Sequence, residues 1–343
     1  MIPDQAWDLL TTDLPTELEP WVLRFAEAAT FSERERRSYA WSMHLLSRLS
    51  GQAVTTAVMG VLTTEQPGRM PEVTDITAGF IPYEQGAGGG ARSLREARME
   101  IAVPFVEANN LRYAFGVVIG ITPPEDSSDE VNEEKQTPSQ VVSIDNYPVV
   151  VEYRRVRYSA PPNPNGATAA CYAKPRASKR FFGPTWTDGI VIARHSLKNL
   201  GFSTGVSVPM ANGGSCLVTD IDTSTTIDAV ILNCGAVPSH TSTLSLATAV
   251  APGSNVDVRT ASRTFSAQVL RVNDHPSYYG NLIAHRLFLD TTGTPGDSGS
   301  LVIRTPHADS AGLYMGHTGG SAPEGLVQSM RQIVHYFDVD LFD

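Results

Sequence analysis

Short apolar, β-branched segments recur through the second half of the chain and limit its fold more than any other feature. Gly, Ser, Thr and Pro, the usual turn formers, separate them. The segments read GIVIA, SCLVTDI, AVILN, NVDVRT, AQVLRV, RLFLD, SLVIR and AGLYMG. Segments of this length and spacing are typical of strands in a β-sandwich or a β-barrel. We therefore predict a mainly β domain over residues 165–343.

The end of the chain has a different period. From Glu324 to Phe337 the apolar residues fall on one helical face, which predicts a C-terminal helix. The residues of that face are Leu326, Met330, Ile333, Val334 and Phe337.

The first half divides into two regions. Residues 1–51 form a predicted helical segment, in which Ser32 and Glu35 make a capping box and Gly51 fits a helix end. Residues 72–158 form a small α/β region with four predicted strands, and we expect it to regulate the second half or to dock a partner. Its strands lie in DITAGFIPYE, MEIAVPFVE, RYAFGVVIGI and YPVVVEYRRVRY, and the acidic segment PPEDSSDEVNEEKQTPSQ is a predicted loop.

Composition excludes several classes of function. The net charge of −10 argues against a nucleic-acid partner, and no apolar run is long enough to span a bilayer. The N-terminus MIPDQAWDLL lacks the basic start and apolar core of a signal peptide. Three cysteines are too few for a disulfide framework. Cys216 and Cys234 could pair, but buried free thiols fit a reduced, cytoplasmic protein better.

Neither a cofactor nor a metal ion is expected. Residues 86–91, GAGGGA, match the outline of a dinucleotide fingerprint, with Glu107 at a suitable distance. The helix available after them, RSLREAR, is too short to cross back over a sheet, so we interpret these residues as a flexible loop. No CxxC or HExxH spacing occurs, so a metal site has no support.

A histidine, an aspartate and a serine each stand at a predicted strand end or turn. His195 follows GIVIA, Asp228 precedes AVIL, and Ser298 lies in TPGDSGSLV. A serine hydroxyl is a weak nucleophile that needs a base and a group to orient that base. The order His, Asp, Ser is that of the chymotrypsin-like arrangement and not of subtilisins or α/β-hydrolases. Asp220 and Asp222 are alternatives for the acid, but an apolar strand directly follows Asp228.

On these segments the second half resembles the trypsin-like serine peptidases, and most of all their Deg-type and glutamyl endopeptidase members. GIVIARHSL, DAVIL and LFLDTTGTPGDSGSLV are similar to the family's histidine, aspartate and nucleophile segments. The resemblance implies a double six-stranded β-barrel with a C-terminal helix. It implies that Ser298 attacks the scissile carbonyl, that His195 acts as base and then acid, and that Asp228 orients the imidazole. The N–H groups of Gly296 and Ser298 would form the oxyanion hole.

Two positions near the site depart from secreted trypsins, and a third keeps the aspartate but lacks its usual partner. Ser196 replaces a disulfide-forming cysteine after the histidine, which fits an intracellular setting. Ser300 replaces the second glycine of GDSGG, as in glutamyl endopeptidases. In secreted trypsins, the aspartate at the position of Asp297 pairs with a new N-terminus that cleavage creates. Here it either finds another partner, or its loop is disordered until cleavage or binding.

The resemblance also suggests substrate-binding residues. AGLYMGHTGG is similar to the strand and Gly pair that line the family's substrate groove, which places Gly319 there. His317 corresponds to a histidine that helps glutamyl endopeptidases bind an acidic side chain, or it is a groove-wall residue with no selective role. Thr292 falls near the position of the basic-residue selector of trypsins, so the sequence does not support a Lys/Arg preference.

These observations predict an intracellular serine endopeptidase that acts on a protein or peptide substrate and is regulated by its N-terminal half. Intracellular trypsin-like peptidases with helical N-terminal modules occur in bacterial defence operons, where a partner switches them on, so an activating protein partner is a further expectation. The alternative is a catalytically latent protein that uses a peptidase fold as a binding scaffold. A third hypothesis is an esterase or other acyl hydrolase on the same site.

Overall fold

The computed structural model describes most of the second half of the chain and separate elements of the first. The described residues are 42, 46, 49, 51–62, 73–81, 114–121, 140–144, 147–153, 156–158, 168–176, 186–197, 200–201, 203–210, 214–221, 227–234, 242–247, 250–272, 286–318 and 323–343.

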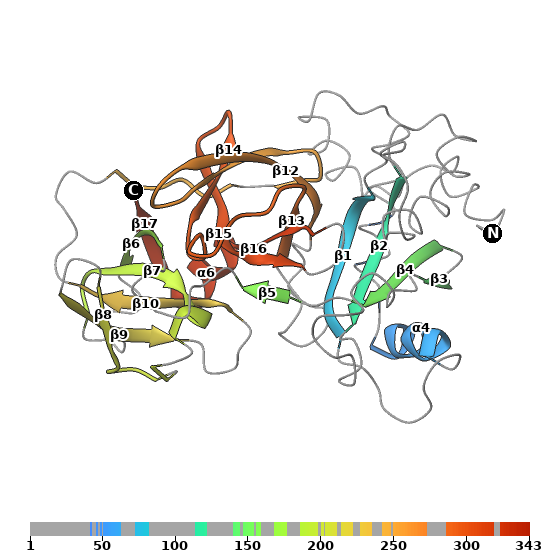
Figure 1. The fold of residues 1–343 in the computed structure, drawn as a ribbon, viewed down its shortest axis with the longest axis horizontal. Helices are drawn as coiled ribbons and strands as arrows, with labels where there is room; N and C mark the ends of the chain where they lie inside the picture. Colours follow the sequence, from blue (N-terminus) through green and yellow to red (C-terminus); the bar gives the residue numbers. More distant parts are fainter. Residues whose placement is uncertain are drawn as a thin grey trace.

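Six antiparallel strands in the last third of the chain close into a barrel (Figure 1). Each strand pairs with the next, and the last pairs with the first. In order around the barrel they are β11 (Asn255–Arg259), β14 (Leu301–Thr305), β15 (Asp309–Thr318), β16 (Gly325–Ser329), β13 (Arg286–Leu289) and β12 (Thr264–Val272).

A second unit is a six-stranded antiparallel sheet. Its edge strand β17 comes after the helix α6 (Met330–Phe337), so the end of the chain returns to the unit that its middle began. In order the strands are β17 (Val339–Phe342), β6 (Ala169–Pro175), β7 (Gly189–Ala193), β10 (Ala229–Asn233), β9 (Ser215–Ile221) and β8 (Ser207–Pro209). The two units and the terminal helix confirm the predicted fold class.

Alternation along β7 and β10 explains how the second unit is held to the barrel. Side chains of a strand point to opposite faces in turn. Val191 and Ile231 lie in a core cluster with Leu301 of the barrel and Phe337 of α6. Their neighbours Ile190, Ile192, Val230 and Leu232 lie in a separate cluster with residues of β8 and β9. Both strands are therefore buried on both faces, which fits their continuous apolar sequences.

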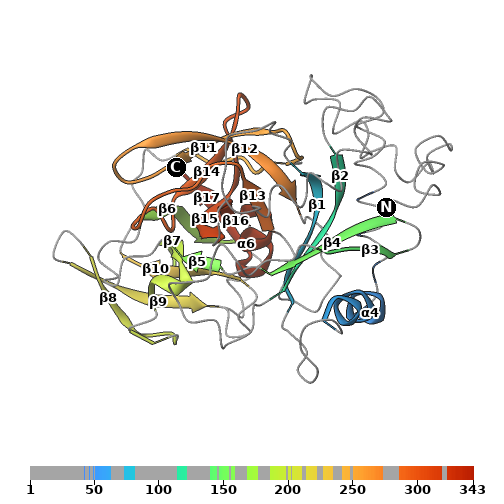
Figure 2. The same ribbon diagram turned by 45° about the vertical axis from the view of Figure 1, so that its right-hand side comes forward.

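The N-terminal strands extend the barrel sheet instead of forming a sheet of their own (Figures 1 and 2). Beyond β12 the order is β1 (Val73–Ile81), β2 (Ala114–Ile121), β4 (Tyr147–Tyr153) and β3 (Gln140–Ile144), with β2 and β4 parallel. The helix α4 (Gly51–Leu62) packs against β3 and β4. One core cluster joins Ile76 and Val117 of this region to Val269 and Leu287 of the barrel.

A short strand, β5 (Val156–Tyr158), leaves this region and pairs with β15 of the barrel. The predicted strand segment YPVVVEYRRVRY is thus divided between β4 and β5, which lie in different places.

Two predictions about helices need correction. The C-terminal helix begins at Met330 and not at Glu324, because residues 325–329 pair with β13 and β15 as β16. Gly51 starts α4 and does not end a helix. Ser42 and Leu46 are helical, whereas Leu49 is not, so the break comes just before Gly51. Pairing with neighbouring strands outweighed the helical period of residues 324–329.

The expectation of free thiols at Cys216 and Cys234 is wrong. The two cysteines form a disulfide with a Cα–Cα distance of 4.5 Å. β9 and β10 are antiparallel neighbours, which brings together residues 18 apart in sequence. Cys171 remains a free, buried cysteine, and burial, followed by the charge of Asp343, raises the pKa of its thiol to about 12.

Several predictions concern residues outside the described ones. They are the helical segment apart from Ser42, Leu46, Leu49 and Gly51, the strand at MEIAVPFVE, the GAGGGA segment with Glu107, and nearly all of the acidic segment. Among the described residues no helix is long and apolar enough to cross a membrane.

Candidate active site

Ser298 lies in a tight turn immediately before β14. Gly299, which follows it, has a φ of 91°, and a Cβ atom there would lie 1.9 Å from the carbonyl oxygen of Thr168. The Thr168 N–H donates to the Ser298 carbonyl oxygen at 3.0 Å, and the Ser300 N–H donates to that of Asp297 at 3.1 Å. Glycine is needed here because the backbone is left-handed and another backbone passes close by. These contacts fix the peptide groups around the serine.

His195 and Asp228 come from neighbouring strands of the second unit. His195 lies in the 3₁₀ turn Arg194–Leu197 directly after β7, and Asp228 directly precedes β10. Ala193 of β7 pairs with Ala229 of β10, so the end of one strand lies beside the start of the other. The hydrophobic strands therefore place the two polar residues side by side.

The three side chains are joined in series. His195 Nε2 lies 2.8 Å from Ser298 Oγ, and His195 Nδ1 lies 2.5 Å from Asp228 Oδ2. The backbone N–H of His195 donates to the other carboxylate oxygen of Asp228 at 2.9 Å. Asp228 is thus held by two hydrogen bonds from one residue, and this geometry fixes the imidazole with Nε2 toward the serine.

Electrostatics keep Asp228 ionised in a buried position. Burial alone would raise the pKa of its carboxyl group. The interaction with His195, including its hydrogen bonds, and the charge of Arg286 outweigh burial and lower that pKa below its ordinary value. A carboxylate that stays charged can stabilise an imidazolium beside it.

Ser298 has a second partner that the sequence did not suggest. Its hydroxyl donates to the carbonyl oxygen of Met315 in β15 at 2.5 Å. A serine hydroxyl has one proton, so it cannot donate to Met315 and to His195 Nε2 at the same time. The hydroxyl must leave Met315 before it can give its proton to the imidazole.

The predicted oxyanion donors lie in the same turn. Gly296 has a φ of 101°, and its carbonyl oxygen accepts a hydrogen bond from Thr168 Oγ1 at 3.1 Å. Within the part of the chain that the structure describes, the N–H groups of Gly296 and Ser298 donate no hydrogen bond. Because the bond from Ser300 orients the Asp297 carbonyl, the Ser298 N–H of the same peptide group points the opposite way. The Ser298 N–H is therefore available to donate a hydrogen bond to a developing negative charge.

Asp297 has found a partner in Arg263. Asp297 is 5% exposed, and its Oδ2 lies 3.0 Å from Arg263 Nη2. The same oxygen accepts bonds from the Thr294 N–H at 2.7 Å and from Thr294 Oγ1 at 3.1 Å. Of the two alternatives that the sequence left open, another partner or a disordered loop, the structure has another partner. Arg263 stands in the turn between β11 and β12, where no sequence signal singled it out.

The other candidates are less connected to this cluster. Asp220 lies in β9, on the far side of β10 from β7, and Asp222 and Gly319 are outside the described residues. Thr292 is half-buried in the segment before the nucleophile turn. His317 is half-buried near the end of β15, where its Nδ1 donates to the Thr318 carbonyl oxygen at 2.9 Å.

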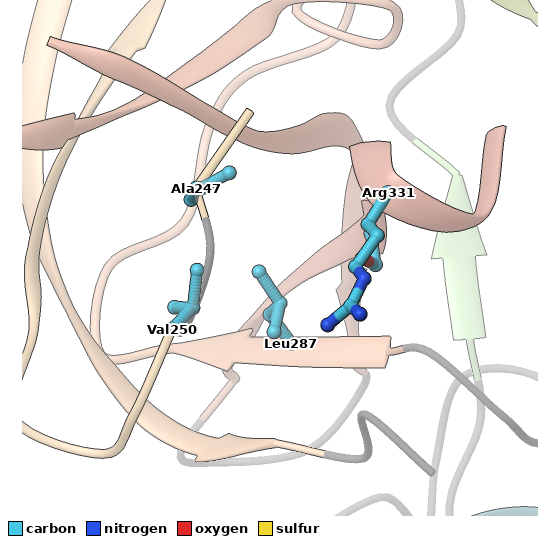
Figure 3. A pocket seen from close by; sticks show the side chains of 6 residues that line it. Ala247, Val250, Leu287 and Arg331 are labelled. Carbon is cyan, nitrogen blue, oxygen red and sulfur yellow. The ribbon is translucent and has the colours of Figure 1, made fainter. Parts of the chain in front are cut away.

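A small pocket lies elsewhere, against the start of α6 (Figure 3). It contains none of the predicted site residues. Its lining is Ala247, Val250, Leu287, Ala311, Ser329 and Arg331.

The two six-stranded units, with a serine, a histidine and an aspartate joined where they meet, give this chain the fold of the chymotrypsin-like serine peptidases. No family model and no curated protein matches the sequence.

Solved structures show similarity to about half of the chain. They include a glutamic-acid-specific serine protease (16% identity, TM-score 0.38, 52% of this chain and 98% of that chain). A Nocardiopsis protease has 17% identity and a TM-score of 0.37, over 51% of this chain and 97% of its own. Thermobifida fusca protease A has 15% identity and a TM-score of 0.38, over 51% and 90%.

Proposed function

We propose that this chain is a serine endopeptidase in which Ser298 is the nucleophile. The observation that carries the proposal is that His195 lies within hydrogen-bond distance of both Ser298, at 2.8 Å, and Asp228, at 2.5 Å. Acyl transfer by a serine needs this series of nucleophile, base and orienting group. A pure scaffold has no physical need to place these three side chains together.

In the proposed reaction, His195 Nε2 takes the proton of Ser298 as Oγ attacks the carbonyl carbon of the scissile peptide bond. The carbonyl oxygen becomes an oxyanion that the N–H groups of Gly296 and Ser298 stabilise. The imidazolium then gives its proton to the amine nitrogen, the C–N bond breaks, and an acyl-enzyme remains. Water attacks the acyl group, His195 takes its proton, and that proton returns to Ser298 Oγ. Asp228 stays ionised throughout.

Labelling with a fluorophosphonate tests this proposal on the full chain. We expect the wild type to be labelled and Ser298→Ala to lose the label completely. Ser300→Ala is the matched control. Ser300 lies two residues after Ser298, and its hydroxyl is buried and hydrogen-bonds to no described group. It should keep the label. Equal labelling of wild type and Ser298→Ala, or none in either folded protein, would contradict the proposal.

A latent binding protein is the second candidate, and the contact between Ser298 Oγ and the Met315 carbonyl favours it. A serine that remains bonded to a main-chain oxygen does not attack. Failure to label the folded wild type would support this candidate over the peptidase. Turnover of a peptide against an ester separates the peptidase from an acyl hydrolase.

Substrate preference is a finer part of the proposal. We propose that Thr292, His317 and Gly319 line the substrate site, with His317 contributing to recognition of an acidic side chain. Cleavage-site profiling on a denatured protein mixture tests this. His317→Ala should reduce cleavage after Glu and Asp more than cleavage after other residues. An unchanged profile would leave His317 as a wall residue.

The sequence predicts an intracellular protein. The Cys216–Cys234 disulfide weighs against that prediction, because disulfides persist mainly in oxidising compartments. Alkylation during lysis of native cells decides between the two. Capture of both cysteines as thiols supports the cytoplasm. Recovery of the disulfide-linked peptide contradicts it.

A further inference from the structure

The strand β5 lies on the edge of β15 that continues from the nucleophile turn. β15 pairs with β14 through residues up to Leu313 and with β16 along its opposite edge through His317. β16 pairs with Gly316 and His317 along one edge of β15, so β5 must pair along the opposite edge. This is the edge on which the pairing with β14 ends at Leu313. There Tyr158 pairs with Gly316, Arg157 with His317 and Val156 with Thr318.

The edge between β14 and β5 belongs to the active site. The Tyr314 N–H donates to the Ser300 carbonyl oxygen at 2.9 Å, and the Tyr314 carbonyl oxygen accepts from the Gly299 N–H at 2.8 Å. The next residue, Met315, accepts the hydrogen bond from Ser298 Oγ. β5 begins to pair at the residue after that. The nucleophile and β5 are therefore consecutive neighbours along one edge of one strand.

The direction of β5 matters as much as its position. β5 is antiparallel to β15, so its residue numbers rise from Thr318 toward Gly316. Its carboxyl end therefore lies toward Met315 and Ser298. An extended peptide that pairs with this edge in the same direction would run toward the nucleophile.

We propose that β5 is an internal competitor for the peptide substrate, held on the edge of β15 beside the nucleophile, where an extended substrate would pair. This inference rests on the proposed endopeptidase function. A peptide that adds to an exposed sheet edge gains its affinity from main-chain hydrogen bonds, and these are the groups that β5 already occupies. The restraint is a matter of backbone pairing, so it does not depend on the side chains of residues 156–158.

The rest of the N-terminal region keeps β5 close to this edge. β1 pairs with β12 at Ala78 and Gly79. The Thr77 hydroxyl of β1 accepts a hydrogen bond at 3.3 Å from Arg271, which is fully buried and forms an ion pair with Glu324. Glu324 in turn accepts from the Thr318 N–H through its carbonyl oxygen at 2.9 Å. A buried network thus runs from β1 to the residue of β15 that pairs with Val156.

Such anchoring gives β5 a high effective concentration, on the order of mM for a short tether. A competitor of this kind raises the apparent KM for a peptide and leaves kcat at saturation unchanged. It has little effect on a small phosphonate, which needs only the nucleophile, its base and the oxyanion donors.

Two proline variants of the full chain test the proposal. Successive N–H groups of a strand point to opposite sides, so one of Val156→Pro and Arg157→Pro removes an N–H that faces β15, and the other removes one that does not. Each is the control for the other, and Arg157→Ala controls for the side chain. We expect one proline variant to hydrolyse fluorescein-labelled casein about tenfold faster through a lower KM. The other two variants should stay near wild type, and all should react with a fluorophosphonate at the wild-type rate.

The outcomes separate this inference from the proposed function. Phosphonate labelling of Ser298 with equal casein hydrolysis in all variants overturns the role of β5 and leaves the peptidase standing. Absence of labelling in every folded variant overturns the peptidase and this inference with it.

Hydrogen exchange of the wild type covers the case in which the proline variants do not fold. A peptidyl phosphonate, built from a casein cleavage site, must displace β5, whereas a small fluorophosphonate need not. Amide exchange at residues 156–158 should therefore be faster after labelling with the peptidyl compound. Equal exchange with both compounds overturns the proposal.

Discussion

Replacing Arg263 with alanine should loosen the nucleophile turn without unfolding the protein. Arg263 is the cation that the structure pairs with Asp297, and its guanidinium also lies over the Phe265 ring at 5.2 Å. Asp297 directly precedes Ser298, and its carbonyl oxygen is part of the peptide group that holds one of the two proposed oxyanion donors. Removing the arginine leaves the carboxylate with the two hydrogen bonds from Thr294.

The size of the effect follows from the exposure of the two partners. A hydrogen bond to a charged group contributes about 1.5–3 kcal/mol. The Arg263 side chain is 46% exposed, against 7% for Asp297, so water screens the pair and its contribution falls below that range. We expect a loss of about 1 kcal/mol, which lowers Tm by roughly 2 °C in a chain of this size. If the loss falls on the turn alone, the rate of phosphonate labelling drops about fivefold.

The assay is the rate of fluorophosphonate labelling beside a thermal melt. Arg259→Ala is the control, because Arg259 lies on the preceding strand in an exposed pair with Asp343 at 3.8 Å. It should label and melt like the wild type. Arg263→Ala with wild-type labelling and an unchanged Tm would refute the reasoning that Arg263 orders the turn.

Four further predictions concern the site and its supports. Asp228→Asn should lower kcat on the order of 10⁴-fold, measured on a peptide that the wild type cleaves. The pKa of Asp228 is lower in the folded state than in the unfolded state. Its contribution to stability is therefore present above the unfolded-state pKa and should be lost as pH falls through the folded-state pKa. Denaturant titrations of the wild type and Asp228→Asn at acidic pH measure this loss. Gly299→Ala should lose phosphonate labelling and melt at a lower temperature, because its Cβ would lie 1.9 Å from the Thr168 carbonyl oxygen. The double variant Cys216→Ser/Cys234→Ser should lose about 3 kcal/mol in the free energy of unfolding, measured by urea titration. A disulfide that closes a loop of this length typically contributes about that much.

Each of these predictions has an outcome that contradicts it. Asp228→Asn with kcat near wild type would remove Asp228 from the proposed mechanism, and parallel acid titrations of the two proteins would show that its ionisation does not support the fold. Gly299→Ala with normal labelling would mean that the turn can move away from Thr168. An unchanged free energy of unfolding in the double serine variant would mean that the disulfide is not formed in the purified protein.

Local patterns predicted most of the second half of the chain. Segments such as GIVIA and AVILN became β7 and β10, because an apolar, β-branched run is a strand in nearly any fold that can bury it. The same logic failed at residues 325–329, where a helical period and a strand position were both compatible with the residues, and pairing with β13 and β15 decided. The strands β3, β6, β8 and β17 and the helix α4 were not predicted.

By itself, the sequence determined which polar residues stand at strand ends and turns, and so which side chains to examine: His195, Asp228 and Ser298. Only the tertiary structure decided what lies beside them. It pairs Asp297 with Arg263, Ser298 with the Met315 carbonyl, Cys216 with Cys234, and β5 with the free edge of β15. The physical reason is that the tendency to form a strand is a property of neighbouring residues. Contacts between strands depend instead on their order and register, which the packing of the whole chain sets.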